Sequence, residues 1–392
     1  MNPELLARDF EPKIIEARRL FHKNPELSGK ETGTARRLRA LLDGAGIAWR
    51  PCGKSLPGTL AEVRGGRPGA TFMLRADMDA LPVLEKTGLP FASRNTGIMH
   101  ACGHDCHMAM LYGAALMAQA IAPEIPGTIR FIFQPSEENG AGAPDMIADG
   151  AMEGVDAMFG MHVWPDLPAG QVSIEKGGRM ASVDRFKITV EGVGGHAAMP
   201  HLCKDPAPAV AAIVTALQTV VSREMGPLEN ALLTVGTITS GTRWNVIAGA
   251  AEVTGTVRTF SESARQTIER SMRRIATESA AAFGCKATVA YDRLSDPVIN
   301  DEAMAGVARK ALEKVPGLAA ASYPPTLVGE DFGFYCTQAP AAFAFFGVAD
   351  PDSKAPAHPL HSDLCTPYEP ALVKGALLHL ATALEYLESR AA

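Results

Sequence analysis

The 392-residue chain lacks any excess of positive charge and any long, uninterrupted apolar run. It has 37 Lys and Arg against 43 Asp and Glu, and its net charge is −6. Nucleic-acid binding therefore has no electrostatic support, and no basic block marks an anionic membrane surface. The longest apolar stretches, Met108–Ala122 and Ala209–Val221, carry polar residues and fall short of the ~18 residues needed to span a bilayer. We expect neither a nucleic-acid nor a membrane partner.

Signals for secretion and for a disulfide framework are also missing. The first residues do not show the basic-then-apolar layout of a secretory signal. The seven cysteines are an odd number in a long chain, which argues against a disulfide scaffold. The composition, 47% hydrophobic and 20% charged, is that of an ordinary globular protein. We therefore expect a cytoplasmic, reduced protein.

Helical and strand patterns alternate in the first part of the chain. Residues 1–50 show helical spacing of apolar side chains. Short apolar runs at Thr59–Arg64 and Ala70–Ala76 flank a Gly- and Pro-rich stretch, which predicts a hairpin. Strands that alternate with helices predict an α/β layer. The further elements expected here are a helix over Asp105–Ala122 and buried strands over Thr128–Gln134 and Met158–Val163.

Residues 183–292 follow a different order of elements. They predict strand, helix, two strands, helix and strand, which is the ferredoxin-like pattern, over about 110 residues. The α/β style resumes afterwards and ends in a helix over Pro370–Leu387. We therefore predict one discontinuous α/β domain, residues 1–182 and 293–392, interrupted by an inserted domain at 183–292. The expected elements of the insertion are Arg185–Glu191, Ala207–Arg223, Ala231–Ser240, Ala250–Phe260, Ser261–Ala282 and Lys286–Tyr291.

The densest group of reactive side chains is His100-Ala-Cys-Gly-His-Asp-Cys-His107, at the start of the helix expected at Asp105–Ala122. Imidazole and thiolate are the ligands that borderline-soft divalent metals prefer. Two alternatives remain open on these residues alone. The segment could be polar residues at a helix start without a metal, or half of a structural zinc knuckle. No second Cys/His pair at knuckle spacing appears elsewhere, which argues against the knuckle.

Carboxylates follow two of the predicted strands, where ligand sites of open α/β sheets lie. Glu137 and Glu138 follow a buried strand, so one carboxylate can bind a metal while the other acts as general base. Asp77 and Asp79 close another strand and can bind a metal or orient a ligand histidine. The alternatives are solvated surface residues for the glutamates and a capped turn for the aspartates.

Two further histidines could complete such a site. His162 lies in Gly-Met-His-Val-Trp after another apolar run, and His361 lies in His-Pro-Leu-His-Ser near the end of the chain. A lone histidine at a strand end is more often structural than a ligand. The residues alone leave both possibilities open.

Taken together, these motifs resemble the M20 metallopeptidase family. The matching segments, in order, are Arg-Ala-Asp-Met-Asp-Ala-Leu-Pro, Met-His-Ala-Cys-Gly-His-Asp, Gln-Pro-Ser-Glu-Glu, Gly-Met-His-Val-Trp-Pro and Leu-His-Ser. More narrowly, they resemble its amidohydrolase branch of hippurate hydrolases, N-acyl amino acid aminoacylases and auxin-conjugate hydrolases. The resemblance covers nearly the whole chain. It implies a di-metal α/β catalytic domain with an inserted lid and dimerisation domain, and hence a homodimer.

The resemblance implies a role for individual residues. Glu137 matches the general acid/base, and Asp79 matches the acid that orients the metal site. The wider family has a ligand histidine where this chain has Asp77, so the role of Asp77 stays open. Two divalent ions (Zn, Mn, Ni or Co) are implied, with Cys102 as a bridging thiolate. The implied metal ligands are Cys102, His104, Glu138, His162 and His361.

By the same resemblance, the inserted domain contributes substrate contacts. His196 matches a lid histidine that reaches the substrate carbonyl, often from the partner subunit. Asn245 and Arg258 match residues that hold the substrate carboxylate, which a guanidinium can bind in a bidentate manner. Taken alone, Arg258 could be a surface strand residue. We expect His201 to be a lid-surface or packing residue, and Gly329–Phe332 to support the pocket floor.

The implied reaction is hydrolysis of the amide bond of an N-acyl-L-amino acid, such as benzoylglycine, to a carboxylic acid and a free amino acid. The alternatives are a dipeptidase and a dedicated deacetylase of an N-acetyl metabolite. A different class would be a non-catalytic binder on the same scaffold. All five ligand matches and Glu137 are present, which argues against that class.

Overall fold

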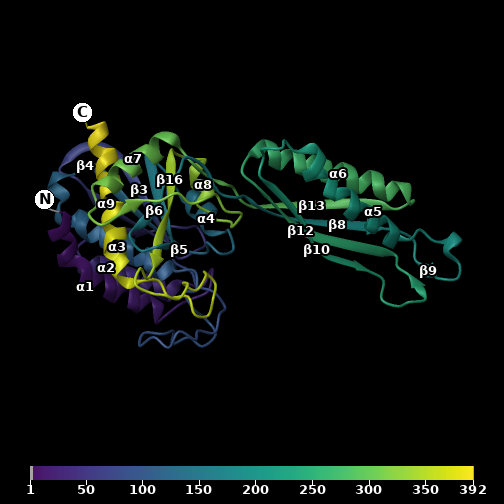
Figure 1. The fold of residues 1–392 in the computed structure, drawn as a ribbon, viewed down its shortest axis with the longest axis horizontal. Coiled ribbons are helices and arrows are strands. Elements are labelled where there is room, and N and C mark those ends of the chain that lie inside the picture. Colours follow the sequence, from purple (N-terminus) through teal and green to yellow (C-terminus); the bar gives the residue numbers. More distant parts are fainter. Residues whose placement is uncertain (1–2, 392) are drawn as a thin grey trace. The chain divides into compact units, whose positions relative to one another are not determined.

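The computed structural model describes residues 3–391. The chain divides into two compact units, both drawn in Figure 1. One unit comprises Met1–Arg179, Ile299–Pro325 and Asp331–Ala392, and the other comprises Met180–Val298 and Thr326–Glu330. The predicted fold class, an α/β domain with an inserted ferredoxin-like domain, is confirmed. The lid and dimerisation roles of the second unit stay predictions.

An eight-stranded sheet forms the centre of the first unit. Its four middle strands run parallel to one another and are mostly buried, as expected for a parallel sheet covered on both faces. The carboxyl ends of these strands therefore meet at one edge. In sheet order the strands are β1 (Ala48–Pro51), β2 (Thr59–Arg64), β4 (Pro126–Gln134), β3 (Arg67–Asp77), β5 (Ala157–Pro168), β16 (Ala341–Ala349), β6 (Gln171–Ser173) and β15 (Ala319–Ala320).

The predicted hairpin between Thr59–Arg64 and Ala70–Ala76 is wrong. β4 lies between β2 and β3, and it pairs with β2 antiparallel and with β3 parallel. The Gly-rich stretch packs against the start of β4 instead of forming a tight turn. The backbone N–H of Gly65 donates to the carbonyl of Gly127 at 2.8 Å, and a Cβ at Gly65 would lie 2.0 Å from the Ile125 carbonyl oxygen. Glycine is required there for close backbone approach.

Helices cover the sheet of the first unit. Figure 1 draws α1, α2, α3 and α9 on one side of the central strands and α4 and α8 on the other. α3 is buried along most of its length and packs against α1 and α9. A Cβ at Gly113 of α3 would lie 2.6 Å from Ile14 and 3.0 Å from Ala376, so glycine permits this close packing. The helices are α1 (Pro3–His22), α2 (Thr32–Gly44), α3 (His104–Ala120), α4 (Gly142–Ala148), α7 (Glu302–Glu313), α8 (Gly333–Cys336) and α9 (Leu372–Arg390).

The second unit is a four-stranded antiparallel sheet in the order β10-β12-β8-β13. Along β8, buried side chains alternate with more exposed ones, and the buried face joins one apolar core with α5 and α6. The main elements are β8 (Val183–Glu191), α5 (Pro206–Thr219), β10 (Ala231–Ser240), β12 (Ala250–Thr259), α6 (Glu262–Ala282) and β13 (Lys286–Ser295). A two-stranded sheet of the same unit pairs β9 (Gly195–His196) with β11 (Val246–Ile247). Another two-stranded sheet pairs β7 (Gly177–Met180) with β14 (Val298–Asn300), and most of its residues belong to the first unit.

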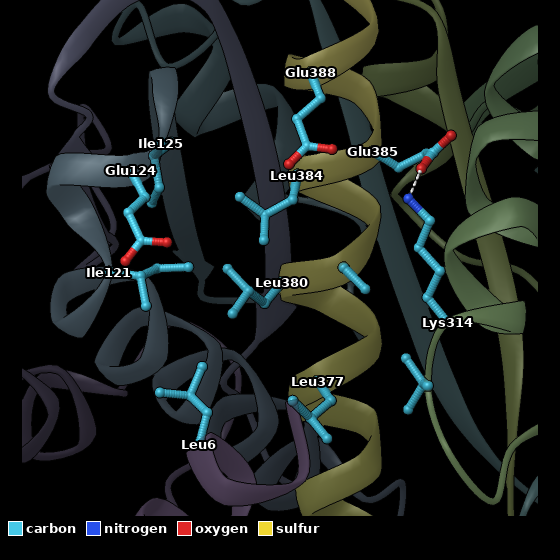
Figure 2. Close-up of a pocket in the computed structure, with 12 residues that line it drawn as sticks. Leu6, Ile121, Glu124, Ile125, Lys314, Leu377, Leu380, Leu384, Glu385 and Glu388 are labelled. Atoms are coloured by element: carbon cyan, nitrogen blue, oxygen red, sulfur yellow. Dashed lines mark hydrogen bonds and ion pairs between the residues drawn. The ribbon is translucent and has the colours of Figure 1, made fainter. Parts of the chain in front are cut away.

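A pocket of about 350 Å³ opens beside α9 in the first unit (Figure 2). Its wall is largely apolar and includes Leu377, Leu380 and Leu384 of α9, together with Ile121 and Ile125. No residue of the predicted site lines it. Within residues 3–391, no helix combines the length and apolarity that crossing a membrane requires.

Candidate metal centre

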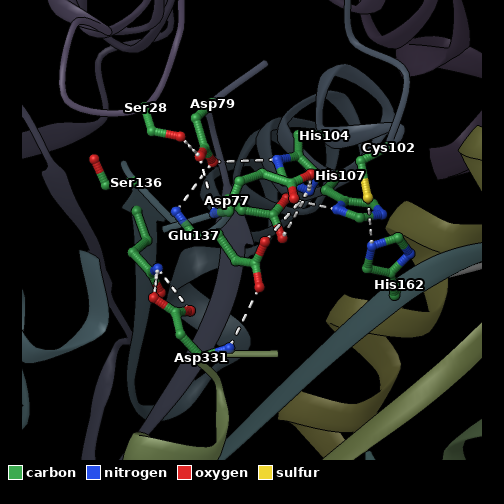
Figure 3. Close-up of polar contacts among 12 residues, drawn as sticks. Ser28, Asp77, Asp79, Cys102, His104, His107, Ser136, Glu137, His162 and Asp331 are labelled. Carbon is green, nitrogen blue, oxygen red and sulfur yellow. Dashed lines mark hydrogen bonds and ion pairs between the residues drawn. The ribbon is translucent and has the colours of Figure 1, made fainter. Parts of the chain in front are cut away.

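Three parallel strands of the first unit deliver polar side chains to the start of α3. β3 ends at Asp77, β4 ends at Gln134, and β5 carries His162. The segments after β3 and β4 turn toward His104, the first residue of α3, as Figure 3 shows. The N-terminus of a buried helix and the carboxyl edge of the sheet thus frame a single site.

The five side chains expected to bind metal lie in one cluster. Cys102 Sγ is 3.4 Å from His162 Nε2 and 3.2 Å from His361 Nε2. Glu138 Oε1 is 3.4 Å from His361 Nε2 and 3.9 Å from His104 Nε2. Two groups share the thiol, Cys102 with His104 and His162, and Cys102 with Glu138 and His361. Within each group the ligand atoms lie within 4.8 Å of one another. This arrangement could hold two ions on either side of one thiolate.

A hydrogen bond sets the tautomer of His162. Its Nδ1 lies 2.7 Å from the carbonyl oxygen of Val163, so this nitrogen carries the hydrogen and Nε2 presents a lone pair toward Cys102. Burial, and after it the neighbouring His107, lowers the pKa of His162 well below its usual value. A neutral imidazole with an available Nε2 is the form that binds a metal ion.

His107, in contrast, uses both ring nitrogens in protein contacts. The N–H of Val163 donates to its Nε2 at 2.9 Å, and its Nδ1 lies 2.6 Å from Asp77 Oδ1. Asp77 Oδ2 also accepts a hydrogen bond from Arg75 Nη1 at 2.6 Å. Asp77, whose role the sequence left open, thus holds His107 and Arg75 beside the cluster.

Several buried polar atoms of the cluster have no hydrogen-bond partner among the described residues. They include Oε1 of Glu138 and both ring nitrogens of His104, although His104 Nδ1 lies 3.3 Å from Asp79 Oδ1 without hydrogen-bond alignment. Burial alone would lower the pKa of His104, but Asp77, Asp79 and Glu138 raise it to about 10. Unsatisfied buried acceptors and an excess of negative charge both favour bound cations. A thiolate, imidazoles and a carboxylate suit borderline divalent ions, so the residues present fit metal ions.

Asp79 holds the turn that carries the two glutamates. Its Oδ1 accepts the backbone N–H of Glu137 at 3.1 Å, and its Oδ2 accepts the N–H of Glu138 at 3.0 Å. Ser28 Oγ donates to the same Oδ2 at 2.6 Å. Glu137 Oε1 accepts the backbone N–H of Asp331 at 3.3 Å, and its Oε2 lies 4.0 Å from His104 Nε2 (Figure 3). The Glu137 carboxylate is thus held beside the ligand cluster.

A buried network behind Glu137 was not anticipated from the sequence. Arg75 Nη2 donates to Asp331 Oδ1 at 2.8 Å, and Arg75 Nε donates to Gln134 Oε1 at 3.1 Å. Gln134 Nε2 and the N–H of Ala143 donate to Asp331 Oδ2 at 2.7 and 3.0 Å. Arg75 and Gln134 lie inside the motifs that carry the family resemblance, which was the available signal. Asp331 lies in the motif expected to support the pocket floor.

A second network ties α1 to the start of α3. Asp105 Oδ2 accepts from Arg18 Nε at 2.8 Å and lies 2.8 Å from His22 Nδ1. The other ring nitrogen of His22 lies 3.2 Å from Glu85 Oε1. Burial alone would lower the pKa of His22, but Asp105 and Glu85 raise it to about 9. His22 is therefore a cation in the folded protein at neutral pH.

In the second unit, His196 and Asn245 lie together. Val246 of β11 pairs with His196 of β9, and the N–H of Ala197 donates to the Asn245 carbonyl at 3.2 Å. The N–H of Ala198 donates to His196 Nδ1 at 3.0 Å, which leaves the hydrogen on Nε2 of this exposed ring. His196 thus presents an N–H donor to its surroundings. His201 is also exposed, in the short 3₁₀ segment Pro200–Leu202.

Arg258 lies at the other end of β12 from that pair. β11 leads directly into β12 at Ala250, and Arg258 follows eight residues later, ~26 Å along a strand. Arg258 Nη1 donates to the Val257 carbonyl at 3.0 Å and also contacts Thr256 Oγ1. One second unit therefore does not bring Arg258 together with His196 and Asn245.

The fold and this centre define a metal-dependent hydrolase. Residues 73–385 match the model of peptidase family M20/M25/M40. An N-acetyl-L-cysteine deacetylase of Bacillus subtilis (strain 168) is 42% identical over 388 residues, which cover 99% of this chain and 91% of the relative. An N-acyl-L-amino acid amidohydrolase of Geobacillus stearothermophilus is 42% identical over 298 residues, or 75% of this chain and 80% of the relative.

A solved structure agrees with this assignment. The crystal structure of a dinuclear metal-binding peptidase of the M20 family from Bacillus subtilis matches with a TM-score of 0.86 and 36% identity, over 97% of this chain and 99% of that one. The chain belongs to the M20/M25/M40 peptidase family and is a metal-dependent amidohydrolase. The resemblance noted in the sequence is confirmed.

Proposed function

We propose that the protein hydrolyses the amide bond of N-acyl-L-amino acids to a carboxylic acid and a free amino acid. The observation that carries this proposal is the Glu137 carboxylate, held by the N–H of Asp331 beside the ligand cluster. A carboxylate next to bound cations is the arrangement that hydrolysis of an amide by activated water requires. The names of the relatives, a deacetylase of N-acetyl-L-cysteine and an N-acyl-L-amino acid amidohydrolase, support the substrate class.

The side chains of the first unit have different roles in the proposed reaction. Two divalent ions would supply Lewis acidity, which polarises an amide carbonyl and lowers the pKa of water. Glu137 accepts the proton of the attacking water and delivers it to the leaving nitrogen. Asp79 keeps Glu137 and Glu138 in place through their backbone N–H groups. The side chains that would hold the ions are Cys102, His104, Glu138, His162 and His361.

Substitution of the proposed base tests this division of work. We expect Glu137→Gln, which keeps the size of the side chain but cannot accept the proton, to lower kcat by about 10²–10⁴-fold. The metal content should stay at the wild-type level, because Glu137 is not among the proposed ligands. Hydrolysis of N-acetyl and N-benzoyl amino acids and elemental analysis of the same sample measure both. Full activity of this variant would contradict the proposed mechanism.

The alternative activities differ in what they demand of the acyl group. A dipeptidase needs a free amine on the acyl side, and a dedicated deacetylase accepts only the acetyl group. A panel of N-acetyl amino acids, benzoylglycine and dipeptides, assayed with Zn, Mn, Co and Ni, separates the three. The name of the B. subtilis relative, N-acetyl-L-cysteine deacetylase, similar over 99% of this chain, leads us to expect the highest activity on the acetylated substrates of the panel.

We further propose that the enzyme works as a homodimer. His196 offers an N–H donor for a developing oxyanion, and Arg258 offers a guanidinium for a carboxylate. Their separation along β12 means that one second unit cannot present both to one small substrate. A second copy, contributing His196 of the partner subunit, removes this conflict. Exposed apolar side chains of the same unit, Trp244 at 89% and Leu228 at 95% exposure, support such an association.

A further inference from the structure

We propose that Glu31 is a positioning residue for the turn Ser136–Glu138, which aims the base and one proposed metal ligand. The assignment of those two roles rests on the proposed function. The Glu31 side chain is completely buried, although a carboxyl group is costly to bury without partners. Its Oε1 accepts the backbone N–H of Ser136 at 2.8 Å, across 105 residues of sequence. This contact joins the start of α2 to the turn that follows β4.

The turn needs such support because its backbone is strained. Ser136 has a φ of 56°, in the left-handed region that residues with a Cβ rarely adopt. Within residues 3–391, only one other non-glycine residue has a positive φ, the proposed ligand His361. Strain of this kind persists only where the surroundings impose it, and it concentrates at functional sites. The hydrogen bond from the Ser136 N–H to Glu31 is a direct means of holding Ser136 in this strained conformation.

Three consecutive backbone N–H groups of the turn point at carboxylates. Ser136 donates to Glu31, and Glu137 and Glu138 donate to Asp79. Figure 3 shows Ser136, Glu137 and Asp79 gathered at this point. Asp79 alone fixes only the last two of these groups. Glu31 fixes the first, and with it the direction in which the chain leaves β4.

From its position at the start of α2, Glu31 would be expected to cap the helix, but its side chain does not do so. It is the N-cap residue of α2, where a carboxylate usually accepts the first helical N–H groups, yet its side chain makes no such bond. Glu26 does this instead, accepting the N–H of Thr34 at 2.6 Å and that of Gly33 at 3.2 Å. Because Glu26 caps the helix, the two glutamates provide a matched pair for an experiment.

Removal of the Glu31 carboxylate should displace the turn Ser136–Glu138 without removing the groups that bind the substrate. We expect Glu31→Met, which has similar length but no acceptor, to lower kcat by about 10- to 100-fold with KM changed less than about threefold. Glu31→Gln keeps an acceptor oxygen and should stay within about threefold of wild-type kcat. The control Glu26→Met loses the helix cap and should lower the melting temperature while kcat stays near wild type below that temperature.

A glycine at position 136 separates positioning from general destabilisation. Glycine adopts a positive φ without a steric penalty, so the turn depends less on Glu31 when Ser136 is replaced. We expect Glu31→Met to reduce kcat by a smaller factor in the Ser136→Gly background than in the wild-type background. A role of Glu31 in overall stability alone would give the same factor in both backgrounds. Equal factors, or a fully active Glu31→Met variant, overturn the proposal.

Hydrogen exchange tests the same inference without any substrate. In the full-length protein, the backbone amides of residues 136–138 should exchange at least about tenfold faster in Glu31→Met than in wild type and Glu26→Met. Unchanged exchange would overturn the positioning role even if the protein hydrolyses N-acyl amino acids. If the wild-type protein hydrolyses none of them, the proposed function fails, and the exchange result still decides the role of Glu31.

Discussion

The state of the Cys102 thiol depends on the charge around it. Burial, followed by the charges of Glu138, Glu137 and Asp77, raises the pKa of its thiol well above the usual value. The thiolate that a bridging ligand requires therefore forms only when positive charge is present. If Cys102 binds the ions as proposed, metal binding and loss of the thiol proton would be one event at this residue.

Replacement of this thiol should empty the centre. We expect Cys102→Ser to lose most of its divalent metal and nearly all hydrolytic activity, because a serine hydroxyl stays protonated and is a poor ligand for borderline-soft ions. Elemental analysis of the purified variant measures the loss. Cys106→Ser is the matched control, since Cys106 is fully buried at the start of α3, four residues after Cys102, and lies outside the ligand groups. A Cys102→Ser variant that keeps two ions per chain would contradict the bridging role.

The proposed metal ligands were the easiest residues of the site to find in the sequence, and the residues that position them were the hardest. Cys102 and His104 stand out in the sequence because unusual residue types cluster within one short segment. Glu31 carries no such signal, and Arg75 has only its place in a family motif, since buried charges look like surface charges in a sequence. Their partners lie 105 and 256 residues away, at Ser136 and Asp331. Only the folded chain reveals which charge meets which partner.

At the scale of elements, α1 and α3 are joined by an ion pair that depends on pH. His22 of α1 contacts Asp105 of α3 and Glu85, and Arg18 lies beside the same aspartate. The pKa of His22 is about 9 in the folded protein, against ~6.5 in an unfolded chain. The folded state therefore keeps a proton that the unfolded chain releases as pH rises from ~6.5 to 9.

This difference predicts a loss of stability at alkaline pH. The contribution of His22 is fully present below pH ~6.5 and disappears as pH rises through about 9, on the order of 3 kcal/mol in all. His104 also has a raised pKa, so the wild-type protein alone does not isolate the effect. We expect the free energy of unfolding of His22→Gln to fall less steeply between pH 6.5 and 9, measured by urea denaturation at each pH. Parallel pH profiles for the two proteins would refute the assignment.

The positions of strands could be predicted where the apolar residues recur with a strong period, but the pairing of one strand with another could not. The expected strands at Thr59–Arg64 and Thr128–Gln134 agree closely with β2 and β4. The hairpin failed because a Gly-rich connection between two strands resembles a tight turn. In the fold, β4 enters between β2 and β3 from about 60 residues further along the chain. Such long-range pairing leaves no mark in the short window of residues that predicts a turn.

At the scale of the whole molecule, the arrangement of the second unit limits which proposed substrate contacts one chain can make with one substrate. His196 lies on β9, which pairs with β11 just before β12 begins at Ala250, whereas Arg258 lies eight residues further along β12, near its other end. The family resemblance named both as substrate contacts, but no sequence pattern shows that they are separated. β10 forms an edge of the four-stranded sheet, and an unpaired edge strand can associate with another chain. The proposed homodimer therefore makes a prediction about how activity is shared between chains.

Mixing two inactive variants should restore activity. Glu137→Gln lacks the base of its own centre, and His196→Ala lacks the donor proposed to serve the partner's centre, so each homodimer should be inactive. In a mixed dimer, the chain with intact Glu137 receives His196 of the partner subunit, and one of the two centres is complete. After subunit exchange at equal amounts, half of the dimers are mixed, so about a quarter of wild-type activity should return. If His196 acts within its own chain, no centre in the mixture is complete and activity stays at the level of the separate variants.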